Sequence, residues 1–293
     1  MMIMAINNPL RYPGAKSKLV PYIEKLIKSE GLTSCTLYEP YAGSAAVTFA
    51  LLDSGTISKA IINELDPLIY CFWISVMEHT EDLIQLIQDT EISLDNWILF
   101  SQYRDVNYIA NRSTLEIGFA GLFLNRTSFS GILKAGPLGG FEQKSRYKID
   151  CRFNKERVIE SIRLLSNFRN KIEIYNMDAV DFLKQKTKYK RNSKTFVYID
   201  PPYYEKGPSL YRYYYNQQMH KDLSRFIKKK SYPWLISYDN SDDIKKLYRN
   251  SKQQHIYLDY SVNSHIKGKE LLVSNLEIPP MENNNFLEES IIG

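Results

Sequence analysis

Short apolar segments alternate with helical hydrophobic patterns along most of this chain. The run at residues 195–199, Thr-Phe-Val-Tyr-Ile, consists of β-branched and aromatic side chains, as buried strands do. Several such runs end at a polar or acidic residue and are followed by apolar positions at helical spacing. This alternation predicts an α/β fold with a parallel sheet. The expected strands cover residues 36–38, 60–63, 171–175, 195–199, 234–237 and 271–274.

The pattern changes between Asp66 and about Asn170, where a long, mostly helical stretch precedes a segment rich in Gly, Ser and Pro at residues 125–140. We therefore interpret residues 71–165 as an insertion, and residues 1–70 and 166–275 as the α/β domain that receives it. The last residues, 276–293, contain two prolines and three consecutive asparagines and are expected to form a flexible tail.

The segment Asp200-Pro201-Pro202-Tyr203 directly follows one of the expected strands. Parallel sheets bind ligands at the carboxyl ends of their strands. The two prolines stiffen the chain, so the Asp200 carboxylate and the Pro201 carbonyl are held in a fixed relation beside an aromatic ring. Two acceptors beside a flat ring suit a planar group with an exocyclic amine, such as adenine. A strand that merely ends in a tight turn is the alternative.

A second candidate site follows the first expected strand, at Glu39-Pro40-Tyr41-Ala42-Gly43-Ser44. Its small residues allow backbone to approach a ligand closely at the start of a helix. The glycine spacing of a nicotinamide site is missing, and Glu39 would repel a pyrophosphate. A ligand with an amino group and a positive charge fits better, although a turn needed only for packing explains the same residues.

Acidic residues also follow two other expected strands. Glu64 stands where a nucleoside-binding α/β fold takes the ribose hydroxyls, while Asp66 could cap the next helix. Asp178 could accept the exocyclic amine of a cofactor adenine, and a helix N-cap explains it equally well.

Basic residues exceed acidic ones, giving a net charge of +5. The expected tail contributes four glutamates and no Lys or Arg, so the rest of the chain carries +9. Basic residues cluster at positions 184–194 and 228–230. This surplus is compatible with a polyanionic partner, and an ordinary solvated surface accounts for it as well.

Composition excludes several classes of protein. No apolar stretch approaches the roughly 20 residues of a membrane span, and the N-terminus lacks the basic flank of a signal peptide. The three cysteines and four histidines are too scattered for a disulfide framework or a metal centre. We therefore expect no metal, and a reducing cytoplasm is the simplest location.

The order of these motifs resembles that of the Dam-type DNA adenine-N6 methyltransferases, the alpha group with a DPPY motif. The resemblance covers residues 7–275. The matching stretches are residues 9–16, 39–44, 63–64, 123–131 (which contain Asn125-Arg126), 200–204, 234–240 and 269–272. It implies a Rossmann-like S-adenosylmethionine-dependent methyltransferase sheet, with an inserted, mostly helical target-recognition subdomain that carries a β-hairpin.

For the cofactor, the resemblance implies S-adenosylmethionine, with Glu64 at the ribose and Asp178 at the adenine end. The other implied cofactor residues are Tyr12, Lys16, Glu39, Tyr41, Ala42, Gly43, Ser44 and Asp200. For catalysis it implies Asp200, Pro201, Pro202 and Tyr203. The carboxylate and the Pro201 carbonyl would accept the two N–H groups of an adenine flipped out of duplex DNA, and Tyr203 would stack on its ring. Methyl transfer would be an in-line displacement without a metal or a covalent intermediate.

For DNA recognition, the resemblance implies contacts from Arg11, Asn125 and Arg126 and an aromatic wedge at Phe129. Ser130 and Lys134 occupy two base-reading positions where the GATC-specific members have Asn and Arg. Lys does not replace a bidentate Arg reader of guanine, so no recognition sequence is assigned. Double-stranded DNA is the expected partner of a monomer, and a cognate restriction endonuclease is left open.

Two further features leave alternatives open. Tyr211-Arg212-Tyr213-Tyr214-Tyr215 could form a lid that stacks on bases, or could pack at the start of a helix. DPPY also occurs in RNA methyltransferases, and the related NPPY serves protein-glutamine methylation. The block around residues 125–131 favours DNA over both. A non-catalytic DNA-binding protein would not need the intact residues 200–203.

Overall fold

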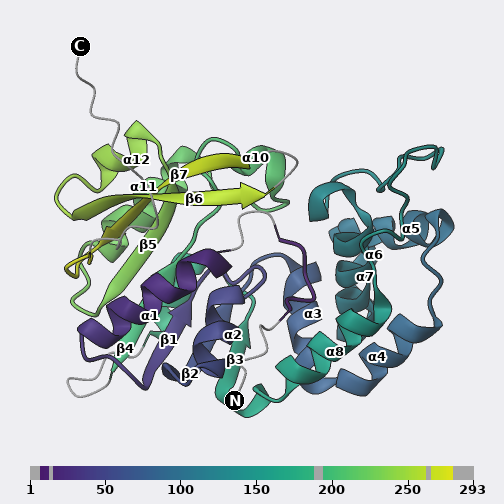
Figure 1. Cartoon of the computed structure of the whole chain (residues 1–293), viewed down its shortest axis with the longest axis horizontal. Coiled ribbons are helices and arrows are strands. Elements are labelled where there is room, and N and C mark those ends of the chain that lie inside the picture. Colours follow the sequence, from purple (N-terminus) through teal and green to yellow (C-terminus); the bar gives the residue numbers. More distant parts are fainter. Residues whose placement is uncertain (1–6, 13–15, 188–193, 262–264, 280–293) are drawn as a thin grey trace.

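A single mixed sheet organises the molecule in our computed structural model, which describes residues 7–12, 16–187, 194–261 and 265–279 (Figure 1). In this part of the chain the sheet has seven strands in the order β3-β2-β1-β4-β5-β7-β6. The parallel strands are β1 (Cys35–Glu39), β2 (Ile57–Asn63), β3 (Ile172–Tyr175), β4 (Thr195–Ile199) and β5 (Trp234–Asp239). β7 (His265–Ser274) runs antiparallel between β5 and β6 (Lys252–Ser261). The predicted Rossmann-like α/β class is confirmed.

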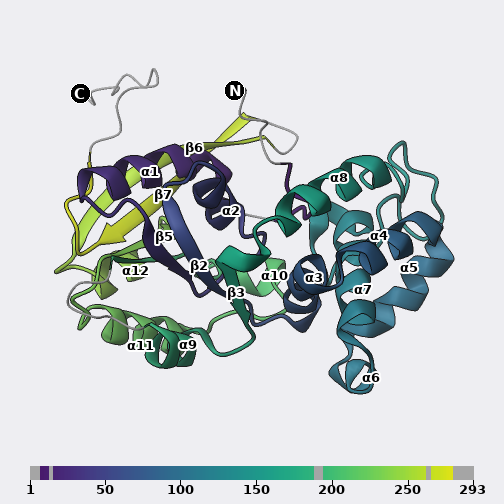
Figure 2. The same ribbon diagram turned by 90° about the horizontal axis from the view of Figure 1, so that it is seen from below.

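Helices cover both faces of the sheet (Figure 2). On one face lie α1 (Val20–Ser29) and α2 (Ala46–Asp53); on the other lie α9 (Ala179–Lys186), α11 (Gln217–Ile227) and α12 (Asp242–Leu247). The alternation along β4 explains the two layers, because successive side chains of a strand point to opposite faces. Phe196 and Tyr198 pack with the first set of helices, and Val197 and Ile199 with the second. A short helix, α10 (Gly207–Leu210), follows the DPPY segment.

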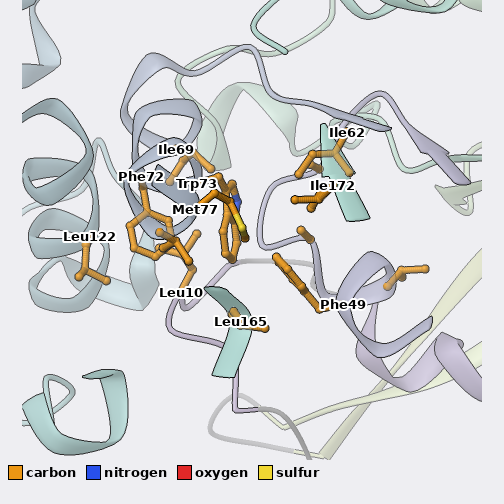
Figure 3. Close-up of a cluster of buried hydrophobic side chains, with 14 of the residues drawn as sticks. Leu10, Phe49, Ile62, Ile69, Phe72, Trp73, Met77, Leu122, Leu165 and Ile172 are labelled. Carbon is orange, nitrogen blue, oxygen red and sulfur yellow. The ribbon is translucent and has the colours of Figure 1, made fainter. Parts of the chain in front are cut away.

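The predicted insertion forms a helical unit beside the sheet (Figure 1). It contains α4 (Thr80–Asp89), α5 (Leu94–Ser101), α6 (Val106–Ile109), α7 (Thr114–Thr127) and α8 (Lys155–Ser166). These helices follow α3 (Pro67–Glu78), which continues without a break across the predicted boundary at residue 71. Side chains from both units share one apolar cluster, in which Trp73 and Leu122 lie with Phe49 and Ile62 (Figure 3).

Two glycines of α7 bring it close to α3. A Cβ on Gly118 would lie 2.5 Å from the Cys71 carbonyl oxygen, and one on Gly121 would lie 2.3 Å from that of Leu68. Any larger residue would force the helices apart. Because α3 begins at the end of β2, this packing fixes the helical unit relative to the site edge of the sheet.

The expected β-hairpin does not form in the described segment that follows α7. Residues 129–131 form a 3-10 turn, and Ser128 and Pro137 make an isolated antiparallel bridge. Ser130 and Gly131 have φ values of 56° and 74°, so the chain turns where a hairpin strand would extend. The first residues of the predicted tail contact the α/β domain, where the Tyr22 hydroxyl donates to the Pro279 carbonyl at 2.6 Å. Residues 280–293 lie outside the described part.

Among the described residues, no helix combines the length and the apolar character needed to cross a membrane.

Candidate active site

A cleft lies at the carboxyl ends of β1, β2 and β4. The strand order reverses between β1 and β4, and ligands of open α/β sheets bind at such a point. The cleft has a volume of about 760 Å³, including the part that opens to solvent. Of the candidate cofactor residues, those that line it are Tyr12, Lys16, Glu39, Tyr41, Ala42, Gly43, Ser44, Glu64 and Asp200.

The turn between β1 and α2 forms one wall of the cleft. Gly43 has a φ of 48°, and a Cβ there would lie 2.7 Å from the Tyr12 ring. Its N–H donates to Glu64 Oε2 at 2.8 Å, and its carbonyl accepts from Trp73 Nε1 at 2.8 Å. Glycine is therefore required both for the backbone conformation and for the close approach of Tyr12.

Two buried carboxyl groups face this turn. Glu64 also accepts from the Asp66 N–H at 2.9 Å; burial, supported by the charge of Asp66, raises the pKa of Glu64 to about 7. Burial raises the pKa of Glu39 to about 8, although a hydrogen bond from the Thr48 hydroxyl opposes the change. Asp66 itself caps α3 by accepting from the Leu68 N–H, as expected.

Asp200, directly after β4, forms an ion pair with Lys16, the one lysine among the described residues that line the cleft. Lys16 Nζ is 3.1 Å from Asp200 Oδ1, and the Ser237 hydroxyl donates to the same oxygen at 2.7 Å. Ser237 is oriented in turn by the Tyr198 hydroxyl at 2.8 Å. Burial raises the pKa of Asp200, and Lys16 and Ser237 oppose that rise. Between described residues, the ion pair and the hydrogen bond of Asp200 both fall on Oδ1, which leaves Oδ2 for another donor.

Glu270, on β7, completes this charged cluster, although no role was predicted for it. Its Oε1 lies 3.5 Å from Lys16 Nζ and accepts from the Tyr203 hydroxyl at 3.3 Å. Lys16 Nζ also donates a hydrogen bond to the Tyr203 hydroxyl oxygen at 3.4 Å. Burial alone would lower the pKa of Lys16, but Asp200 and Glu270 raise it well above its ordinary value. The cluster therefore holds a buried ammonium between two carboxylates.

Asp239, at the end of β5, shapes the loop after the DPPY segment and was likewise not predicted. Its carboxylate accepts from the N–H groups of Tyr204 at 2.9 Å and Glu205 at 3.3 Å. The signal for Ser237, Asp239 and Glu270 was their place within the matched stretches 234–240 and 269–272.

The tyrosine-rich segment 211–215, called the strap below, lies over the cleft. Tyr211, Tyr213 and Tyr215 line it. The Tyr211 ring stacks on that of Tyr12 at 6.0 Å and meets that of Tyr203 edge-on at 6.3 Å. The strap thus packs just before α11 and covers the cleft at the same time.

Asp178 is placed behind the cleft wall. Its Oδ1 accepts from the N–H groups of Val180 at 2.9 Å and Asp181 at 3.2 Å, so it caps α9. Its second oxygen accepts from the Tyr215 hydroxyl at 3.3 Å. The N-cap interpretation is confirmed, and the next residue, Ala179, lines the cleft instead.

Comparison with known proteins identifies the family. The sequence model of the D12 class N6 adenine-specific DNA methyltransferases matches residues 12–263, most of the chain. The chain belongs to this family. It is also similar to the Type II methyltransferase M.MjaIII of Methanocaldococcus jannaschii, with 26% identity over 244 residues, which are 77% of this chain and 81% of the relative. The reaction of this D12 class methyltransferase is therefore site-specific methylation of adenine N6 in DNA.

The residues predicted to contact DNA divide into buried and exposed groups. Asn125 is fully buried; its amide donates to the Arg11 and Gly131 carbonyls at 2.9 and 3.0 Å. Its oxygen accepts from the Arg11 N–H at 2.7 Å. Arg126 donates to the carbonyls of Asn8 and Pro9. Both side chains bond to backbone and so position residues 8–12. Asn125 is buried there, whereas Arg126 stays partly exposed.

The exposed group lies on the turn after α7. Phe129 is 63% exposed, and Lys134 is exposed and donates to the Pro208 carbonyl. Ser130 and Arg11 are partly exposed beside them. By contrast, Lys184 at the end of α9 and Lys194 before β4 lie at the amino edge of the sheet, away from the cleft. Lys186, also in α9, has its Nζ 4.2 Å from the centre of the Tyr175 ring. The basic residues of that cluster at 188, 190 and 191 lie outside the described part.

Proposed function

We propose that this methyltransferase uses S-adenosylmethionine, bound in the cleft, as its methyl donor. When bound, this compound supplies an electrophilic methyl group. The cleft suits it because buried carboxylates and aromatic rings favour a ligand with an amino group, ribose hydroxyls and a positive charge. We assign the ribose hydroxyls to Glu64 and the amino group to Glu39, and place the adenine end beside Ala179, the residue that follows the N-cap Asp178. Lys16 would bind the carboxylate of the methyl donor while keeping its ion pair with Asp200.

The observation that carries the catalytic proposal is the asymmetric environment of Asp200. Lys16 and Ser237 hold Oδ1, so the carboxylate cannot rotate freely and Oδ2 is left for the amino group of the target adenine. The Pro201 carbonyl would accept the second N–H. A nitrogen that gains a methyl group must lose one proton, and we assign that proton first to the Asp200 carboxylate.

The target base has to leave the duplex to reach this position. We propose that Tyr203 provides the stacking surface for it, because Glu270 and Lys16 hold its hydroxyl and so fix its ring. On the DNA side we assign the wedge to Phe129 and the base-reading positions to Ser130 and Lys134. Arg11 would contact a base or a phosphate, held in place by Asn125. The enzyme is proposed to act as a monomer on double-stranded DNA; a partner endonuclease and a cytoplasmic location remain predictions.

Transfer of a labelled methyl group tests this proposal. Wild-type protein should label double-stranded genomic DNA, with little label in RNA. Asp200→Ala and Asp200→Asn should each lower the rate by at least about 100-fold, because an acceptor for the reacting amino group is lost. Calorimetric titration should show that both still bind S-adenosylmethionine.

A matched control is Asp242→Ala, because this exposed carboxylate pairs with Lys245 on α12, away from the cleft. It should keep the wild-type rate. Label in RNA alone would contradict the DNA assignment, and near-normal transfer by Asp200→Asn would contradict the catalytic one.

A further inference from the structure

Arg212 lies where three parts of the molecule meet. It belongs to the strap, between two tyrosines that line the cleft. Its side chain is only 9% exposed and forms an ion pair with Asp66 at 2.9 Å. It also donates to the backbone carbonyl of Arg104 at 2.7 Å, in the 3-10 turn after α5. One planar guanidinium therefore joins the strap, the start of α3 and the helical insertion.

The Asp66 contact leads to the cofactor side of the cleft. Asp66 caps α3, and its N–H donates to Glu64 Oε1 at 2.9 Å. The neighbouring Tyr211 touches the rings of both Tyr12 and Tyr203. A ligand in the cleft would contact the strap tyrosines directly and would favour the strap position in which Arg212 reaches Asp66.

The Arg104 contact leads to the turn that carries the proposed DNA contacts, residues 128–137. The Arg104 guanidinium donates to the Ala135 carbonyl at 2.8 Å and to the Ser128 hydroxyl at 3.5 Å, and lies 4.8 Å from the Trp97 ring. A second link joins the same turn to the segment before the strap, because Lys134 donates to the Pro208 carbonyl.

We propose that Arg212 is a positioning residue that couples binding of the cofactor in the cleft to binding of DNA by the turn 128–137. This inference rests on the proposed function. Closing the strap over the cofactor fixes Arg212, which fixes Arg104 and hence the turn. Coupling between two binding sites is reciprocal, so DNA must also tighten cofactor binding. A lysine would keep the charge but could not bridge Asp66 and the Arg104 carbonyl with a planar fork.

The test measures coupling by calorimetric titration of S-adenosylhomocysteine, with and without a duplex that wild-type protein methylates. For wild type we expect the duplex to lower the Kd of S-adenosylhomocysteine by about 5-fold or more, within the usual range of coupling. For Arg212→Met and Arg212→Lys the factor should fall below about 2. Arg225→Met removes an exposed arginine that pairs with Asp222, and should keep the wild-type factor.

Thermal unfolding identifies any variant that merely fails to fold, and Arg212→Lys keeps the proposal testable if Arg212→Met does so. Wild-type coupling in a folded Arg212→Lys protein would overturn the inference, as would a wild-type factor near 1. In either case methylation of the duplex by wild-type protein shows that the proposed function stands. Absence of that methylation counts against the proposed function itself.

Discussion

At the scale of single residues, Lys16 is a buried cation on the cleft wall. Its side chain is 2% exposed, and its ammonium group lies between the carboxylates of Asp200 and Glu270. A buried charge is tolerated only where partners compensate for lost hydration. We therefore propose different tasks for the two carboxylates. Asp200 also faces the proposed position of the target adenine, whereas Glu270 holds Lys16 and the Tyr203 hydroxyl.

Glu270→Gln should lower turnover by about tenfold to 100-fold, because a hydrogen bond to a charged group contributes about 1.5–3 kcal/mol. The Kd of the cofactor should change much less, since the glutamine keeps the shape of the site. Steady-state kinetics of methyl transfer together with titration of the cofactor separate the two effects. Glu277→Gln, at an exposed ion pair with Lys252, is the control and should behave as wild type. Equal losses in turnover and in cofactor affinity would show that Glu270 acts on binding instead.

At the scale of elements, the turn from β1 into α2 links the parts of the cleft wall where we propose that the cofactor binds. It links Gly43 to Glu64 at the end of β2 and to Trp73 in α3, so two strands and a helix depend on one tight backbone conformation. A side chain at this glycine would meet the Tyr12 ring before any ligand arrived.

Gly43→Ala should therefore weaken cofactor binding by more than about tenfold, roughly the effect of 1.4 kcal/mol. Gly55→Ala is the matched control, because Gly55 also has a positive φ, +69°, but a Cβ there meets nothing within 4 Å. Both variants should lose stability through backbone strain. Only Gly43→Ala should lose affinity in a titration with S-adenosylmethionine, and equal affinities of the two variants would contradict the close approach of Tyr12.

The strands that carry the site could be predicted because their side chains are apolar on both faces. β6 could not, since its first residues, Lys252, Gln253, Gln254 and His255, are polar, as befits a strand at the edge of the sheet. The first half of β7 was missed because its sequence is also mostly polar, although β7 lies between β5 and β6. The hairpin expected from the family resemblance failed locally, because the left-handed residues Ser130 and Gly131 turn the chain.

Much of the cleft wall could be predicted too, since the ends of parallel strands necessarily converge at one edge. Glu270 could not be assigned a role by that reasoning, because it reaches Lys16 from the antiparallel strand β7. Asn125 shows the opposite error: a polar residue beside a recognition segment was expected to face DNA, but it is buried and bonds to backbone.

At the scale of the whole molecule, several buried groups make stability depend on pH. His220, which is fully buried against Tyr238, has its pKa lowered by burial to about 4, so its contribution to stability is lost as pH falls from about 6.5 towards 4. Glu39 and Glu64 act in the opposite direction. Their pKa values are raised to about 8 and about 7, so the folded protein loses stability as pH rises from about 4.5 through those values.

Glu39→Gln should remove one of these losses. Without ligand, its unfolding temperature should exceed that of wild type at pH 9 by several degrees, given about 1.4 kcal/mol for each pKa unit. At pH 4 the advantage should vanish, because the wild-type carboxyl is then protonated in both states. Scanning calorimetry across this pH range measures the difference; a constant offset at every pH would argue that packing, and not the charge of Glu39, is responsible.

The most direct measurement is a map of modified adenines in DNA. Unmethylated genomic DNA would be incubated with purified protein and S-adenosylmethionine and then read by single-molecule sequencing, with Asp200→Ala protein in parallel. We predict N6-methyladenine within one short sequence motif after wild-type treatment and none after treatment with the variant. Unmodified adenines after treatment with folded wild-type protein that binds the cofactor would contradict the account, and so would equal methylation by the variant.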